Sequence, residues 1–198
     1  WPARQAAGIR CSSRLRIAIG RSPSWPSSLA KPRQRKGSLI SFDNAVKTGA
    51  PLGPLEEHRF ASAGEQGVNL ILRLPGRDPK LAPLLVGAHY DGPLHSPGAD
   101  DNASGIAVLL ELARRWAADP PRRPVWIVAF DQEEWGMVGS TALAQELRSA
   151  RQPLKLMVSL EMLAFTSERQ DYPVAGMERV YGNRGDFIAL VANAGAGL

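Results

Sequence analysis

Histidine and carboxylate side chains are concentrated in residues 88–105, which read AHYDGPLHSPGADDNASG. His89 supplies an imidazole, and Asp101 supplies a carboxylate twelve residues later. Imidazole and carboxylate are the ligand types that bind zinc in many hydrolytic sites. This stretch therefore indicates a metal site suited to hydrolysis.

The segments on either side of this stretch predict how it is positioned. Residues 83–88 are apolar and predict a buried strand, and residues 104–117 carry apolar side chains at helical spacing. His89 then lies at the end of a strand, and Asp101 lies in the loop before a helix. Open α/β sheets bind ligands at the carboxyl ends of their strands, so the position agrees with the chemistry.

Acidic residues also follow two later apolar runs. Residues 124–130 predict a second buried strand, and the acidic turn 131–134 follows it directly. Residues 154–162 predict a third strand, which contains Glu161. If these strands are parallel neighbours, their ends meet at one edge of the sheet together with His89.

Glu133 and Glu134 form an adjacent acidic pair in this turn. Such a pair is by default an exposed acidic turn, but this one follows a buried strand and precedes Gly136. Adjacent residues in an extended chain point to opposite sides, so two different roles are expected. One acid fits a metal ligand, and the other fits a general base that faces the attacking water.

The order of apolar patterns predicts the fold class. Further elements are expected as a strand at residues 68–74 and as helices at residues 137–149 and 186–193. Alternating strands and helices predict a three-layer α/β/α sandwich around a mixed, mostly parallel central sheet. We expect the runs after Gly67 and after Pro83 to form an antiparallel pair at one edge of this sheet.

Length and composition limit the classes of protein to which this chain can belong. A chain of 198 residues can form one domain with a substantial core. It contains no apolar run near the roughly 20 residues that span a bilayer, so no transmembrane segment is expected. The single cysteine, Cys11, excludes an intramolecular disulfide and a cysteine metal cluster. The compartment stays open: secreted, periplasmic and cytoplasmic locations all fit.

The net charge of +5 is unevenly distributed. Residues 1–40 contain nine Lys or Arg and no acid, so the rest of the chain has 15 basic and 19 acidic residues. This basic segment has three possible interpretations: a basic arm for nucleic acid or membranes, a targeting peptide, or a disordered or non-native extension. The composition favours the extension. We therefore divide the chain into this segment, residues 1–40, and a catalytic domain, residues 41–198.

The motifs AHYD, GADDNASG, AFDQEEWGMVGS and VSLEMLAF, in this order and at these intervals, resemble the co-catalytic zinc aminopeptidases of metallopeptidase family 28. The resemblance covers roughly residues 55–198. It implies four zinc ligands, namely His89, Asp101, Glu134 and Glu161. It also implies that Asp101 bridges two zinc ions, that Glu133 is the general base acting on a metal-bound water, and that Asp91 orients His89.

One family feature is missing from this sequence. The second zinc of the family has a further histidine downstream, whereas this chain has no histidine after His95. We therefore expect an incomplete catalytic domain that binds at most one Zn²⁺ well and has little activity by itself. Two Zn²⁺ ions are expected in the full-length protein.

The function implied by the resemblance is a zinc exopeptidase that hydrolyses N-terminal peptide bonds, with peptides as substrates and no nucleic acid partner. A glutaminyl cyclase-like enzyme is an alternative that uses a single zinc and does not use the position of His89. A non-catalytic binding domain of the same fold is a second alternative, although such relatives usually lose ligands.

Other polar residues receive simpler interpretations. We expect His58 and His95 to be exposed, and Asn102 and Ser104 to cap the following helix. Tyr90 and Trp135 flank the predicted site, where either substrate contact or packing is possible.

Overall fold

The structure is a computed structural model that describes residues 54–62, 64–172 and 175–193. Every helix and strand described below belongs to the compact unit Pro32–Ile188. Of the second unit, the structure describes residues 189–193, which contain no helix or strand. The basic segment 1–40 and its predicted boundary lie outside the described residues.

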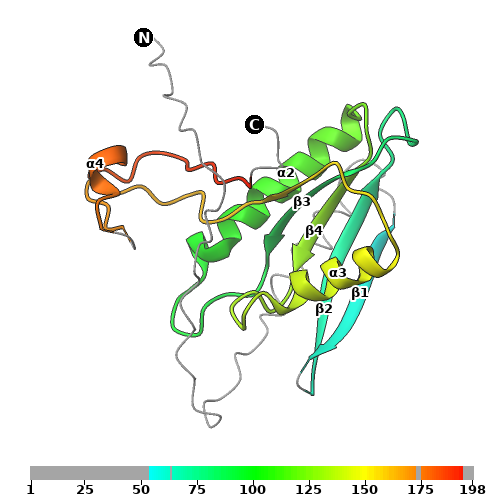
Figure 1. Ribbon diagram of the computed structural model, residues 1–198, viewed down its shortest axis with the longest axis horizontal. Helices are drawn as coiled ribbons and strands as arrows, with labels where there is room; N and C mark the ends of the chain where they lie inside the picture. The colour runs from blue at the N-terminus through cyan, green and yellow to red at the C-terminus, as the bar shows by residue number, and fades with distance from the viewer. Residues whose placement is uncertain (1–53, 63, 173–174, 194–198) are drawn as a thin grey trace. The chain divides into compact units, whose positions relative to one another are not determined.

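Five strands form one mixed sheet in the order β1-β2-β4-β3-β5. Figure 1 labels β1 to β4 of this sheet. Their bounds are β1 Leu55–Ser62, β2 Glu65–Leu74, β3 Leu84–His89, β4 Val125–Phe130 and β5 Leu156–Ser159. β2 pairs with β1 and β4 in antiparallel orientation, whereas β3 pairs with β4 and β5 in parallel. The predicted mixed sheet is confirmed, and the carboxyl ends of β3, β4 and β5 lie at the same edge.

Two helices cover opposite faces of the sheet, α2 (Gly105–Ala118) and α3 (Val138–Ser149). Leu72 of β2 packs in the same buried cluster as Leu109 of α2, whereas its neighbour Ile71 packs with Leu143 of α3. This alternation follows from the two-residue period of a strand, and burying each such side chain stabilises the fold by roughly 1.5–3 kcal/mol. The predicted three-layer sandwich is confirmed.

The expected antiparallel pair between the runs after Gly67 and Pro83 is wrong. These runs form β2 and β3, and β4 lies between them in the sheet. β3, α2 and β4 form a crossover unit in which β4 pairs with β3 in parallel, so β2 pairs with the other edge of β4.

The edge strands differ most from the prediction. β1 is absent from the prediction, because Phe60 is its one buried residue and the strand has no regular apolar alternation. β5 is shorter than the predicted run 154–162, and Met157 and Val158 in it are 44% and 38% exposed. Neither edge strand is buried on both faces, so neither has the continuous apolar pattern of β3 and β4.

The predicted helix at residues 186–193 is also wrong, because the described residues there form no helix. Ile188, Leu190 and Val191 are 71–84% exposed, so no packing surface supports a helix at this place. Short helices without such packing are marginal in water. A single helical turn, α4 (Glu178–Tyr181), occurs before this segment instead.

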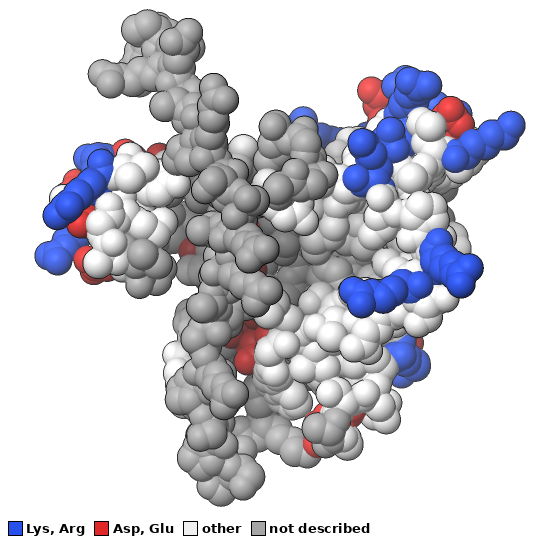
Figure 2. Space-filling model, in the orientation of Figure 1, with Lys and Arg blue, Asp and Glu red and all other residues white. Residues whose placement is uncertain are grey.

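Lysine and arginine side chains gather around the carboxyl end of α2 and the turn that follows it (Figure 2). Arg114 and Arg115 lie there, and both pair with Glu111. Cations near a helix carboxyl end are favoured by the helix dipole. This end of the sheet is opposite to His89, so the basic surface and the candidate site are separate. Among the residues described, no helix is both long and apolar enough to cross a membrane.

Candidate metal centre

His89 is the centre of the site. It ends β3 and is 3% exposed. Its Nε2 lies 3.0 Å from Oδ1 of Asp101 and 3.5 Å from Oε1 of Glu161. Asp101 comes from the turn η1 (Ala99–Ser104), which leads into α2, and Glu161 lies just beyond β5. The parallel pairing of β3 with β5 thus brings Glu161 to His89, and the turn η1 brings Asp101 to the same imidazole.

Glu133 and Glu134 reach the same imidazole from the loop between β4 and α3. The ligand atoms of His89, Glu133 and Glu134 lie within 4.8 Å of one another. Those of His89, Asp101 and Glu161 also lie within 4.8 Å of one another. Among the described residues, the two groups share a single imidazole.

Asp91 holds both the imidazole and the acidic pair. Its Oδ1 lies 3.4 Å from Nδ1 of His89, and its backbone oxygen lies 3.1 Å from the same nitrogen. Its two carboxylate oxygens accept the backbone N–H groups of Glu133 at 3.1 Å and Glu134 at 3.2 Å. A carboxylate on the second nitrogen of a ligating histidine fixes the ring, and here it also fixes the loop.

The charges of the centre are strongly coupled. Burial lowers the pKa of His89, but the hydrogen bond with Asp91 and the surrounding carboxylates outweigh burial and raise the pKa to about 9. Burial, followed by the charge of Asp101, raises the pKa of Glu134 to about 7. Burial is also the main cause that raises the pKa of Glu133 and Glu161. The site therefore gathers more acids than one imidazolium can neutralise.

These residues fit a zinc ion. Oε1 of Glu134 is buried and has no hydrogen-bond partner among the described residues. A buried carboxylate oxygen without a donor is costly, and a cation at this position satisfies it. One imidazole and several carboxylates are a donor set that zinc accepts.

Asn102 fastens the segment that carries Glu161. Its side chain is 1% exposed, and its Nδ2 donates to the backbone oxygen of Leu160 at 2.9 Å and to Oε2 of Glu161 at 3.3 Å. Its Oδ1 accepts the N–H groups of Gly105 at 3.0 Å and Met162 at 3.3 Å. The expected contact with the start of the helix is present, but the bonds to the segment after β5 have no signal in the sequence.

Two neighbours of Asp101 bind the same segment. Ser104 accepts the N–H of Leu163 through its hydroxyl oxygen, and it donates to the backbone oxygen of Asp100. The carboxylate of Asp100 accepts the N–H of Ala164. The predicted capping role of Ser104 is not observed, because its hydroxyl bridges two loops instead.

The remaining single-residue predictions have mixed outcomes. His95 is exposed, as expected. The expectation that His58 is exposed is wrong, since its side chain is 10% exposed. Tyr90 packs in the core beside α2 and donates its hydroxyl to the backbone oxygen of Val68. Trp135 is 37% exposed.

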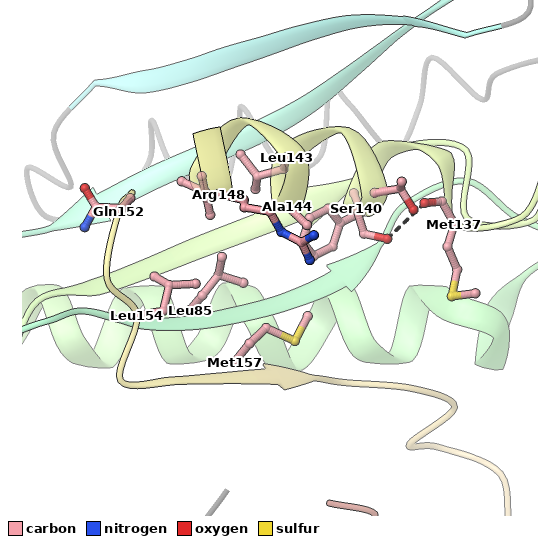
Figure 3. Close-up of a pocket in the computed structure, with 12 residues that line it drawn as sticks. Leu85, Met137, Ser140, Leu143, Ala144, Arg148, Gln152, Leu154 and Met157 are labelled. Carbon is pink, nitrogen blue, oxygen red and sulfur yellow. Dashed lines mark hydrogen bonds between the residues drawn. The ribbon is translucent and has the colours of Figure 1, made fainter. Parts of the chain in front are cut away.

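A pocket of about 480 Å³ lies between α3 and β5 (Figure 3). Its lining is mostly apolar and includes Leu143, Leu154 and Met157. None of the predicted metal ligands lines it. The pocket is therefore a gap between α3 and the edge of the sheet, separate from the metal centre.

Comparison with known proteins places this chain in a family. The model for peptidase family M28 matches residues 69–194. The protein YfbL of Escherichia coli K12, whose description is uncharacterized, is 40% identical over 121 residues, which cover 54% of this chain and 38% of YfbL. A probable zinc metalloprotease of Pyrenophora tritici-repentis is 37% identical over 102 residues, covering 48% of this chain and 24% of its own length.

Further relatives carry the name aminopeptidase. Aminopeptidase YwaD of Bacillus subtilis is 44% identical over 64 residues, which cover 32% of this chain and 14% of YwaD. The LapA aminopeptidase of Legionella pneumophila has a similar structure, with a TM-score of 0.53 and 25% identity over 69% of this chain and 36% of LapA. A glutaminyl cyclase of an Acidobacteriales bacterium has a TM-score of 0.56 at 24% identity, over 67% of this chain and 52% of its own, and shows likeness of fold alone.

This chain spans well under half the length of the curated relatives. The family match nevertheless includes β3, β4, β5 and the loops after them, and thus all six predicted site residues. The resemblance seen in the motifs is confirmed: the chain belongs to peptidase family M28.

Proposed function

We propose that the full-length protein is a zinc-dependent aminopeptidase, which hydrolyses the N-terminal bonds of peptides. The carrying observation is the convergence of Asp101, Glu161 and the Glu133–Glu134 pair on the buried imidazole of His89. Membership of a peptidase family supports hydrolysis of peptides. Relatives described as a probable zinc metalloprotease and as aminopeptidases support the metal and the exopeptidase specificity.

The proposed zinc ligands are His89, Asp101, Glu134 and Glu161, with Asp101 shared between two ions in the full-length protein. When bound, zinc supplies a Lewis acid for the scissile carbonyl and lowers the pKa of water to about 7. Asp91 keeps the His89 ring and the backbone of both glutamates in place before any ion arrives. The protein thus contributes a preformed ligand set.

Glu133 is the proposed general base. It takes the proton of the attacking water and passes this proton to the leaving amine. Burial raises the pKa of Glu133, although the charge of His89 opposes this shift, so its carboxylate binds a proton more readily than an exposed glutamate does. Its backbone N–H is held by Asp91, which limits the positions that the side chain can reach.

The two alternative functions are less well supported. The glutaminyl cyclase-like scheme does not use the position of His89, whereas this residue belongs to both metal-binding groups. A non-catalytic domain does not require a metal ligand at each of these positions, whereas the acids here converge on one buried histidine. Both observations favour the peptidase.

The test uses the full-length protein with an aminoacyl p-nitroanilide and its N-acetylated counterpart. We expect hydrolysis of the free-amine substrate, loss of this activity with a chelator, and recovery on addition of Zn²⁺. The blocked substrate is the control, because an aminopeptidase requires a free amino group. Activity that survives chelation would contradict the zinc mechanism. Cyclisation of an N-terminal glutamine peptide with one bound zinc would favour the cyclase instead.

A further inference from the structure

Asn69 is a buried amide outside the predicted site. It lies on β2, is 0% exposed, and faces the side of the sheet that α3 covers. Its Oδ1 accepts the backbone N–H of Asp131 at 3.0 Å, and its Nδ2 donates to the backbone oxygen of Gly139 at 2.8 Å. Asp131 is the first residue of the loop that carries Glu133 and Glu134, and Gly139 lies in the first turn of α3, directly after this loop. One side chain therefore joins the residues that flank the loop on both sides.

The contact between these loop ends is tight. A Cβ atom on Gly139 would lie 2.3 Å from the backbone oxygen of Asp131 and 2.4 Å from Oδ1 of Asn69. The N–H of Gly139 also donates to the backbone oxygen of Asp131 at 3.1 Å. Only glycine fits at this position, and it allows the first turn of α3 to lie directly on Asn69. A shift at Asn69 therefore passes directly to the loop.

Asp131 extends this network to the backbone of β2. Its side chain is 1% exposed, and its carboxylate accepts the N–H groups of Val68 at 2.9 Å and Gln132 at 3.0 Å. The bond from Val68 fastens the first residue of the loop to β2. Asp91 fastens Glu133 and Glu134 further along the loop, so the loop is held at both its base and its tip.

The orientation of the Asn69 amide is determined by its surroundings. The N–H of Asp131 needs an acceptor and the oxygen of Gly139 needs a donor, so Oδ1 and Nδ2 can be placed in one way only. Nδ2 also lies 2.9 Å from Nδ1 of His58, which sits opposite Asn69 in the β1–β2 register. Nε2 of His58 lies 3.0 Å from Glu146 on α3, which supports the same face from outside.

We infer that Asn69 is a positioning residue for the metal centre, which acts by fixing the base of the loop that carries Glu133 and Glu134. The inference rests on the proposed function, because it makes the placement of a zinc ligand and of the general base depend on this amide. Asn69 touches neither substrate nor metal. Its effect passes through the backbone of Asp131 and Gly139.

The primary test compares Asn69→Leu with Leu143→Ala in the full-length protein. Asn69→Leu keeps the size of the side chain but removes both loop bonds. Leu143 packs under α3 on the same face and is 2% exposed, so Leu143→Ala weakens the fold without removing a loop hydrogen bond. Zn²⁺ affinity is measured by competition with a chelator, well below the unfolding temperature. We expect Asn69→Leu to weaken zinc binding about 10–100-fold and Leu143→Ala to leave it unchanged.

Hydrogen exchange of the metal-free protein gives a second measurement. The N–H groups of Glu133 and Glu134, which bond to Asp91, should exchange faster in the Asn69 variant and at the wild-type rate in Leu143→Ala. If Asn69→Leu does not fold, Asn69→Asp replaces it. Asn69→Asp keeps the acceptor for Asp131 but faces the oxygen of Gly139 with a carboxylate. We therefore expect the same weaker zinc binding and the same faster exchange of the Glu133 and Glu134 N–H groups.

The outcomes separate this inference from the proposed function. Wild-type zinc affinity and exchange rates in the Asn69 variants would overturn the inference alone. Equal losses in Leu143→Ala would also overturn it, because general destabilisation would then explain the effect. A wild-type protein that binds no zinc would overturn the proposed function, and with it any role of Asn69 in zinc binding.

Discussion

The carboxylate of Asp91 lies 3.4 Å from Nδ1 of His89. The opposite ring nitrogen, Nε2, is left facing Asp101 and Glu161. Asp91 therefore selects which nitrogen of the imidazole a metal can use. The same carboxylate also accepts the backbone N–H groups of Glu133 and Glu134. Loss of Asp91 should therefore displace both His89, at the end of β3, and the two glutamates, in the loop after β4.

Replacing Asp91 with alanine should lower zinc affinity about 10–100-fold, the range found for partners that orient metal ligands. Asp91→Asn should have a smaller effect, because its amide oxygen can still accept one backbone N–H. Chelator competition measures both variants. Asp119→Asn is the control, since the Asp119 side chain is 91% exposed. Wild-type affinity in Asp91→Ala would show that the ring needs no such support.

The two adjacent glutamates should respond differently to the same substitution. Glu133→Gln should abolish turnover in the full-length protein and leave zinc bound, because it removes the base but no ligand. Glu134→Gln should weaken zinc binding, because it replaces the carboxylate whose Oε1 has no hydrogen-bond partner among the described residues. Steady-state rates and metal content distinguish the two. Retained turnover in Glu133→Gln would refute the general-base role.

Zinc affinity should rise with pH. The pKa of His89 is raised to about 9, so at lower pH the imidazole carries a proton that zinc must displace. Acid therefore favours the protonated ring and weakens binding, and the affinity should level off above about pH 9. Below the Glu134 pKa of about 7, a second proton should be released as zinc binds. Calorimetry in buffers of different ionisation enthalpy counts these protons.

The matched variant for this measurement is Glu134→Gln. It should lose the second released proton at acidic pH and keep the proton released from His89. An affinity that is constant across the range between the two pKa values would contradict the assignment of His89 as a ligand.

Asn102→Ala should destabilise the fold as well as the site. It leaves the N–H of the buried Gly105 without its acceptor, which costs about 1–3 kcal/mol, and it also removes the acceptor of the N–H of Met162, an exposed residue. Urea unfolding of the metal-free protein measures this loss. Gln145→Ala, at an exposed position of α3, is the control. A midpoint equal to that of the control would show that water replaces both bonds.

The central part of the fold could be predicted from the sequence because it is buried. β3 and β4 have continuous apolar runs, and α2 and α3 have apolar residues at helical spacing, so their positions follow from hydrophobic burial alone. The predicted site residues stand at the ends of these elements. The structure brings all six together, because parallel neighbours end at the same edge.

The elements that differ from the prediction lack this signal. β1 is absent from the prediction and β5 is shorter than predicted, because both are edge strands with exposed side chains. The apolar residues near 188–191 repeat like a helix without a surface to cover. Asn69 was missed for another reason. A polar residue within a strand is usually read as an outward-facing position, and only tertiary structure shows that two loop ends need its amide. Supporting polar groups depend on neighbours that are distant in sequence.

Glu161 follows the shortest and most exposed strand of the sheet, β5, whose four residues contain no fully buried side chain. Local opening of such an edge requires little free energy, and each opening withdraws one carboxylate from the centre. A bound ion would in turn hold Glu161, and with it the end of β5, against His89 on the more deeply buried strand β3. Zinc binding to this chain should therefore oppose local opening of β5, and a substitution that loosens β5 should weaken zinc binding.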